Sequence, residues 1–267
     1  MMLQVRTFIL LIIYLTLGNQ IHSQSQVFIE HSKLPRAQRE AILVLPGFGS
    51  KVFGTKKIAK FFKNKGFDIF IPRYISRKTV RKSIENLDKF IVKHELKEYK
   101  KLHVFSYIFG SWTINSWIKK YGSNNIATLI FDRSPLQERA PATLMKDMPF
   151  ISKLIFGNVM RDFNNTPYLP ANDSSIVKGI FIETFATKLI YKHKSTAFEK
   201  GPVTFDVKAL NQSFDDFCYL PLNHDEMYNQ LDVFGNEVLH FIKNGQFSEQ
   251  AKQFSFVENP FVKFEKK

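Results

Sequence analysis

The stretch KKLHVFSYIFGSW, residues 100–112, decides the fold. Its first part, Leu102 to Ser106, is a short apolar run typical of a buried strand, and a helix is predicted to begin near Gly110. The residues between strand and helix must then form a tight turn. Small residues on both sides of such a turn let the two backbones approach closely. Ser106 and Gly110 fit that requirement, and Ile108 lies at the tip of the turn.

Outward from this stretch, apolar runs alternate with amphipathic segments. Apolar runs that predict strands cover residues 41–48, 67–74, 102–106, 126–132, 176–185 and 214–222. Segments with apolar residues at helical spacing cover residues 55–66, 83–97, 110–120 and 229–243. Strands that are apolar on both faces and alternate with helices favour an α/β fold, in which helices cover both faces of a mostly parallel sheet.

Residues 134–175 interrupt this alternation with prolines and asparagines. An insertion that follows a strand end is where a small cap over a binding pocket commonly lies. The sequence therefore predicts one domain, residues 24–267, with a cap inserted at about 134–175.

The N-terminus has the parts of a secretory signal. One positive charge at Arg6 precedes an apolar run from Phe8 to Leu17 and a polar tail. The apolar run is shorter than the roughly 20 residues that a membrane-spanning helix needs. We expect a signal peptide over residues 1–23, cleavage near Ser23, and export to the periplasm or the medium. The alternative is an uncleaved N-terminal membrane anchor.

Composition excludes several classes of protein. The 267 residues are 44% hydrophobic and 23% charged, which is typical of a globular chain. The net charge of +14 is compatible with weak association with anionic surfaces, but no nucleic-acid-binding motif accompanies it, so no nucleic-acid partner is predicted. No metal-binding histidine pair and no phosphate or dinucleotide loop is present, so we predict no metal and no cofactor. The single cysteine, Cys218, lies in an apolar run and is predicted to be a buried thiol without a disulfide.

Over residues 40–246 the order of these elements resembles the α/β-hydrolase superfamily of esterases and lipases. The loop LVLPGFGS, residues 43–50, resembles the one that supplies an oxyanion-hole amide in that superfamily. The resemblance assigns Gly47, Phe48 and Gly49 to this loop. A backbone donor of this kind is worth ~3 kcal/mol to a hydrolase.

The turn resembles the nucleophile elbow of the superfamily, in which small residues flank the nucleophile at a distance of two positions. Ser106-Tyr107-Ile108-Phe109-Gly110 fits this frame, and it places Ile108 at the nucleophile position. Isoleucine has no lone pair to attack with and no proton to transfer. Two other registers place Ser106 or Ser111 at the tip of the turn. In these registers bulkier residues stand two positions from the tip, where the turn requires small ones.

The rest of a catalytic triad is partly present. LPLNHDEMY resembles the last strand and the loop that presents the catalytic histidine, here His224. The triad acid commonly follows the preceding strand, where this chain has Ala186 or Thr187, while Glu183 lies inside that strand. Some members carry the acid one strand earlier, which corresponds to Asp132. Asp132 could orient the histidine, or it could form an ion pair with the arginine that follows it.

The sequence therefore predicts a catalytically degenerate hydrolase homologue that binds a small apolar or ester-like ligand in a pocket under the cap. Its expected walls are Phe48, Tyr107 and Ile108. The alternative is an active esterase or lipase that uses Ser106, Ser111 or Ser134 as nucleophile and His224 as general base. A third class is proton-transfer chemistry by His224 and Asp132 that needs no nucleophile.

Overall fold

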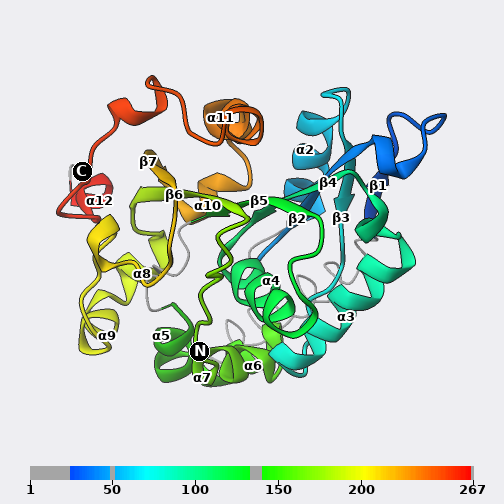
Figure 1. The fold of residues 1–267 in the computed structure, drawn as a ribbon. Coiled ribbons are helices and arrows are strands. Elements are labelled where there is room, and N and C mark those ends of the chain that lie inside the picture. The colour runs from blue at the N-terminus through cyan, green and yellow to red at the C-terminus, as the bar shows by residue number, and fades with distance from the viewer. Residues whose placement is uncertain (1–24, 49–51, 133–139, 266–267) are drawn as a thin grey trace.

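The computed structural model describes residues 25–48, 52–132 and 140–265 (Figure 1). Seven strands form one sheet in the order β1-β3-β2-β4-β5-β6-β7. Only β1 runs antiparallel to its neighbour, so the predicted mostly parallel α/β sheet is confirmed. The strands are β1 (Gln26–Phe28), β2 (Glu40–Leu45), β3 (Asp68–Ile71), β4 (Lys101–Ser106), β5 (Ile126–Asp132), β6 (Val177–Phe185) and β7 (Asp216–Asn223).

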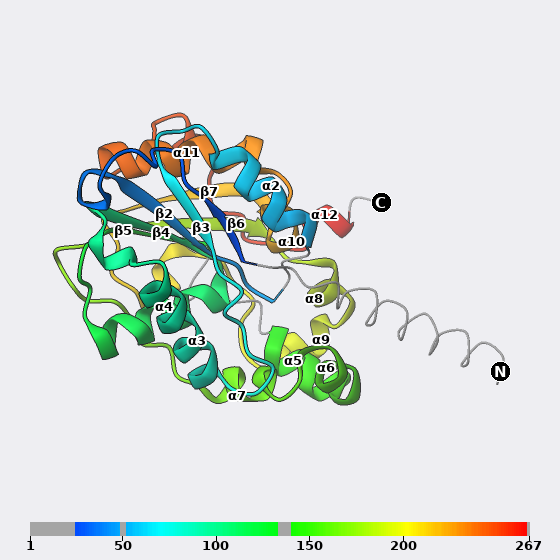
Figure 2. The ribbon, with the colours of Figure 1, turned by 90° about the vertical axis from the view of Figure 1, so that its right-hand side faces the viewer.

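Helices cover both faces of the sheet, as Figure 2 shows. One face is covered by α2 (Val52–Phe62) and α11 (Leu231–Asn244), and the other by α3 (Val80–Lys93) and α4 (Ile108–Tyr121). The remaining helices are α5 (Ala140–Asp147), α6 (Pro149–Phe156), α7 (Val159–Asn165), α8 (Lys188–Lys192), α9 (Lys194–Glu199), α10 (His224–Met227) and α12 (Val262–Glu265).

Strand β2 shows why the sheet is buried on both sides. Ile42 and Val44 pack in the cluster with α2 and α11, while Leu43 and Leu45 pack in the cluster with α3 and α4. All four side chains are fully buried. Successive side chains of a strand point to opposite faces, so an uninterrupted apolar run is what a sheet covered on both faces requires.

The ends of the helices differ from the sequence expectation by a few residues. Helix α3 begins before the expected position because the hydroxyl of Thr79 accepts a hydrogen bond from the Lys82 amide and caps the helix. It also ends earlier, because Glu95 adopts a left-handed conformation with φ of 52°. Helix α11 ends where Gly245 takes the same conformation.

The insertion after β5 contains α5, α6 and α7, which lie together beyond the α3 and α4 layer in Figure 1. Helix α6 leaves much of its apolar surface uncovered, with Phe150 exposed by 76%. Helices α8 and α9 follow β6 and contact α5. These segments stand near the ends of the parallel strands, where ligand sites of open α/β sheets occur.

The predicted signal segment lies outside the described residues. Within the part of the chain that is described, no helix is long and apolar enough to cross a membrane. Cys218 is buried in β7 and forms no disulfide.

Candidate functional site

The turn between β4 and α4 has relaxed backbone geometry. Tyr107 is the N-terminal capping residue of α4, with φ of −76° and ψ of 166°, and Ile108 is the first helical residue. No residue of the described turn, 106–110, has a positive φ. A nucleophile elbow holds its nucleophile in a sharp, strained turn. Ile108, which the sequence resemblance assigns to that position, has no positive φ.

Gly110 supports the register that places Ile108 between two small positions. A Cβ atom at Gly110 would lie 2.5 Å from the carbonyl oxygen of Leu45 and 2.8 Å from its Cβ. Only glycine permits this approach of α4 to β2.

The two serines near the turn do not line the cavity that contains Ile108 and His224. Ser106 and Ser111 are fully buried, and their hydroxyl oxygens lie 3.0 Å apart in a hydrogen bond. The carbonyl oxygens of Ile130 and Tyr107 lie 3.4 Å from Ser106 Oγ and 3.3 Å from Ser111 Oγ, so the hydroxyl that accepts in the serine pair can donate its own proton to a carbonyl. Both hydroxyls thus have partners inside the protein.

His224 is held at the start of α10 by a capping box. The side-chain oxygen of Asn223 accepts from the Glu226 amide at 3.1 Å, and the Glu226 carboxylate accepts from the Asn223 amide at 2.8 Å. This reciprocal pair fixes the direction in which the chain leaves β7. It therefore fixes the backbone position from which the side chain of His224 extends.

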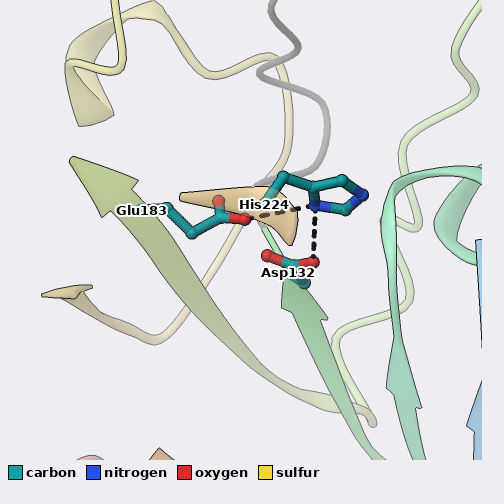
Figure 3. Close-up of side chains that lie close together, drawn as sticks. All are labelled: Asp132, Glu183 and His224. Carbon is teal, nitrogen blue, oxygen red and sulfur yellow. Dashed lines mark hydrogen bonds and ion pairs between the residues drawn. The ribbon is translucent and has the colours of Figure 1, made fainter. Parts of the chain in front are cut away.

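Two buried carboxylates converge on this imidazole (Figure 3). His224 Nδ1 lies 3.1 Å from Asp132 Oδ2 and 3.2 Å from Glu183 Oε1. Both acids have fully buried side chains, whereas the histidine side chain is 18% exposed. The sequence left the acid open between Asp132 and the end of the strand that contains Glu183, and the structure brings both carboxylates to His224.

Strand register explains the position of Glu183. Asp132, the last residue of β5, pairs with Phe181 in β6. Glu183 lies two residues farther along β6, so its side chain is on the same face as the side chain of Phe181. Because the β5–β6 register cannot be read from either strand alone, sequence reasoning had only weak grounds for choosing this acid.

The three groups shift one another's pKa values. Burial, followed by the negative charge of Glu183, raises the pKa of Asp132. Burial opposes a charged ring at His224, but the carboxylates of Asp132 and Glu183 together outweigh it and raise its pKa to about 10. The two carboxylates therefore favour the protonated form of the imidazole, which donates a hydrogen bond from Nδ1.

An apolar cavity of about 210 Å³ lies beside this cluster. Ile108 and His224 both line it, and so do Gly47 and Phe48 from the loop after β2. The other lining residues are Phe109, Ala140, Pro141, Leu144, Phe156, Met160, Phe163, Thr187, Leu189 and Asp225. Side chains of α5, α6 and α7 thus form part of the cavity lining. Gly49 and Ser134, also predicted site residues, lie outside the described residues.

Tyr107 was expected in the pocket wall, but it is not among the residues that line this cavity. Its fully buried ring stacks on Tyr228, with centroids 4.1 Å apart, and its hydroxyl donates to the carbonyl of Met227. Tyr228 is a site residue that sequence reasoning missed. Its hydroxyl accepts a hydrogen bond of 3.0 Å from the Gly47 amide. That amide, expected as an oxyanion donor, thus already has a partner.

The histidine and the two acids also offer ligand atoms to a metal ion. One atom from each of Asp132, Glu183 and His224 lies within 4.8 Å of the others. One imidazole nitrogen and two carboxylate oxygens form a donor set that zinc accepts in proteins.

Neither a family model nor a curated protein sequence matches the chain. Solved structures do match it in fold. Est1E from Butyrivibrio proteoclasticus superposes with a TM-score of 0.54 at 12% identity, and the match covers 83% of this chain and 93% of that one. MGS-MChE2, an α/β-hydrolase from a sediment metagenome of the Mar Chica lagoon in Morocco, superposes with a TM-score of 0.53 at 13% identity. The match covers 82% of this chain and 94% of that one. A structure from work on carboxylesterases of the thaumarchaeon Nitrososphaera gargenis superposes with a TM-score of 0.52 at 10% identity. The match covers 83% of this chain and 94% of that one. The sheet order, the strand-to-helix turn and these superpositions together show that the chain has the α/β-hydrolase fold.

Proposed function

We propose that this protein binds a small apolar or ester-like ligand in the cavity and does not cleave it. One observation carries the proposal: Ile108 and His224 line the same cavity. The sequence resemblance assigns Ile108 to the nucleophile position, and a hydrocarbon side chain there cannot attack an ester. The solved structures of similar fold include esterases, which is compatible with an ester-like ligand.

The cavity chemistry fits a compact, mostly apolar molecule with one polar atom. Most of the lining side chains are aliphatic or aromatic, which is the usual composition of small-molecule sites. Nδ1 of His224 faces the carboxylates, so Nε2 lies on the opposite side of the ring (Figure 3). Nε2 is therefore the nitrogen that would donate a hydrogen bond to a ligand oxygen, such as an ester carbonyl.

An active esterase or lipase is the alternative, and the retained pairing of His224 with two acids is the observation in its favour. The buried and mutually bonded hydroxyls of Ser106 and Ser111 argue against these two serines as nucleophiles. Ser134 follows Asp132 by two residues and is the remaining candidate.

The decisive experiment combines covalent labelling with reversible binding. A fluorophosphonate probe should fail to label the purified protein, while the fluorescent apolar probe 1-aminoanthracene should bind with saturation. Ile108→Trp should fill part of the cavity and weaken binding of this probe at least tenfold. Val92→Trp, at a site that is 62% exposed and does not line the cavity, is the matched control and should bind as the wild type does. Labelling that a single Ser→Ala substitution abolishes would establish the esterase instead.

We also propose that the chain acts after export, because its N-terminal segment has the parts of a secretory signal. Cell fractionation with N-terminal sequencing tests this. A mature protein that begins near Gln24 is expected, and an intact chain in the cytosol would contradict export.

A further inference from the structure

The cluster beside the cavity contains more acid than base. Asp132 and Glu183 are fully buried next to one imidazole, and Asp225 lines the adjoining cavity wall. Among the described residues, Oδ1 of Asp132 has no hydrogen-bond partner, while its Oδ2 pairs with Nδ1 of His224 at 3.1 Å. Buried carboxylates without sufficient partners are costly, and such orphaned atoms in a native site need a physical explanation.

We propose that Asp132, Glu183 and His224 bind a divalent metal ion of the zinc type. The three side chains come from the end of β5, the end of β6 and the start of α10, and both carboxylates approach the same nitrogen, Nδ1 (Figure 3). This inference is independent of the proposed ligand binding, because the metal-binding atoms face one another and the cavity ligand would meet Nε2.

The spacing of the ligand atoms suits such an ion. Nδ1 lies 3.1 Å from Asp132 Oδ2 and 3.2 Å from Glu183 Oε1. In a tetrahedral zinc site with bonds of about 2.0–2.1 Å, neighbouring ligand atoms are about 3.3 Å apart. An ion could therefore take the place of the proton at Nδ1 with only small side-chain movements.

The charge and the donor types favour zinc over magnesium or calcium. One Zn²⁺ neutralises two carboxylates, which removes the charge imbalance of the buried cluster. An imidazole with two carboxylates suits zinc, whereas magnesium and calcium prefer six or more oxygen ligands. Three protein ligands leave a fourth position for a water molecule or a ligand oxygen.

Zinc titration of the full chain, produced without a histidine tag and stripped with EDTA, tests the proposal. Isothermal titration calorimetry and equilibrium dialysis should give one zinc ion per chain at micromolar or lower concentration. Asp132→Asn and Glu183→Gln, which preserve side-chain size, should each weaken binding at least tenfold. His193→Gln is the matched control, because His193 Nδ1 lies 2.6 Å from a carboxylate oxygen of Asp147, remote from the cluster in the sequence. Its zinc affinity should equal that of the wild type.

Two results would overturn the proposal. One is the absence of stoichiometric binding to the wild type. The other is wild-type affinity in both Asp132→Asn and Glu183→Gln, with circular dichroism showing that they are folded. Should these variants fail to fold, Co²⁺ titration of the wild type and anomalous diffraction at the zinc edge replace them. An ion located away from His224 would then refute the site. Because 1-aminoanthracene binding is measured separately, failure of the metal site leaves the proposed ligand binding intact.

Discussion

The close contact between α4 and β2 makes Gly110→Ala a sharp test of the turn geometry. The added Cβ would lie 2.8 Å from the Cβ of Leu45, although non-bonded carbon atoms prefer about 3.5–4.0 Å. Helix and strand would have to separate by about 0.7 Å or more, because the nearest atom is a backbone oxygen that cannot turn aside. The same carbonyl accepts a 3.0 Å hydrogen bond from the Tyr107 amide, which this separation would stretch.

The expected cost follows from three contributions. Overpacking of a buried site costs about 1–3 kcal/mol. A weakened backbone hydrogen bond adds about 0.5–1.5 kcal/mol. Alanine offsets about 1 kcal/mol through its higher helix propensity. We therefore expect Gly110→Ala to lower the free energy of unfolding by about 2 kcal/mol, which lowers the Tm of a chain of this size by about 4–8 °C.

Urea unfolding followed by tryptophan fluorescence, with thermal unfolding by circular dichroism, measures this effect. Gly54→Ala in α2 is the control, because its Cβ would meet the nearest atom, in Tyr228, at 3.3 Å. We expect the control to change stability by less than about 1 kcal/mol. If Gly110→Ala were as stable as the wild type, α4 would not pack on β2 in this register, and the assignment of Ile108 to the nucleophile position would lose its structural basis.

Three further predictions concern single side chains. Tyr228→Phe leaves the buried Gly47 amide without its hydrogen-bond partner, so the free energy of unfolding should fall by about 1–3 kcal/mol. Urea titration measures this change. An unchanged free energy of unfolding would show that water replaces the hydroxyl. Burial lowers the pKa of His103 in the folded protein. The unfolded chain therefore binds a proton more readily, and the free energy of unfolding of the wild type should fall as the pH drops below about 6.5. The fall should be smaller in His103→Gln. Ile108→Ser should gain little esterase activity on short 4-nitrophenyl esters at pH 7, because the carboxylates raise the pKa of His224 and favour the protonated ring there. Any activity should rise with pH toward 10, and full activity at pH 7 would contradict the charged imidazole.

The fold was predictable because its signals are local. Each parallel strand is apolar on both faces, and the helices between strands show their own period, so residues 40–132 alone indicate an α/β sheet. His224 could be placed for a similar reason, because chain order puts it directly after the last strand. Neither inference required the three-dimensional register.

The site residues that were missed depend on long-range contacts. Glu183 reaches His224 only because β5 and β6 pair Asp132 with Phe181. Tyr228 reaches the Gly47 amide across 181 residues of sequence. A single sequence has no periodic pattern that reports such pairings, since both depend on how separate elements dock.

Two tyrosine hydroxyls form hydrogen bonds with the backbone that follows β2. Tyr74 donates to the Pro46 carbonyl at 2.6 Å, and Tyr228 accepts from the neighbouring Gly47 amide. Tyr74 follows β3 and Tyr228 follows α10, so these two hydrogen bonds hold the Gly47 wall of the cavity to two separate parts of the fold. Because the Gly47 amide already donates to Tyr228, it can donate to a ligand oxygen only when that bond is broken or shared. A ligand that uses this amide must therefore displace a tyrosine hydroxyl.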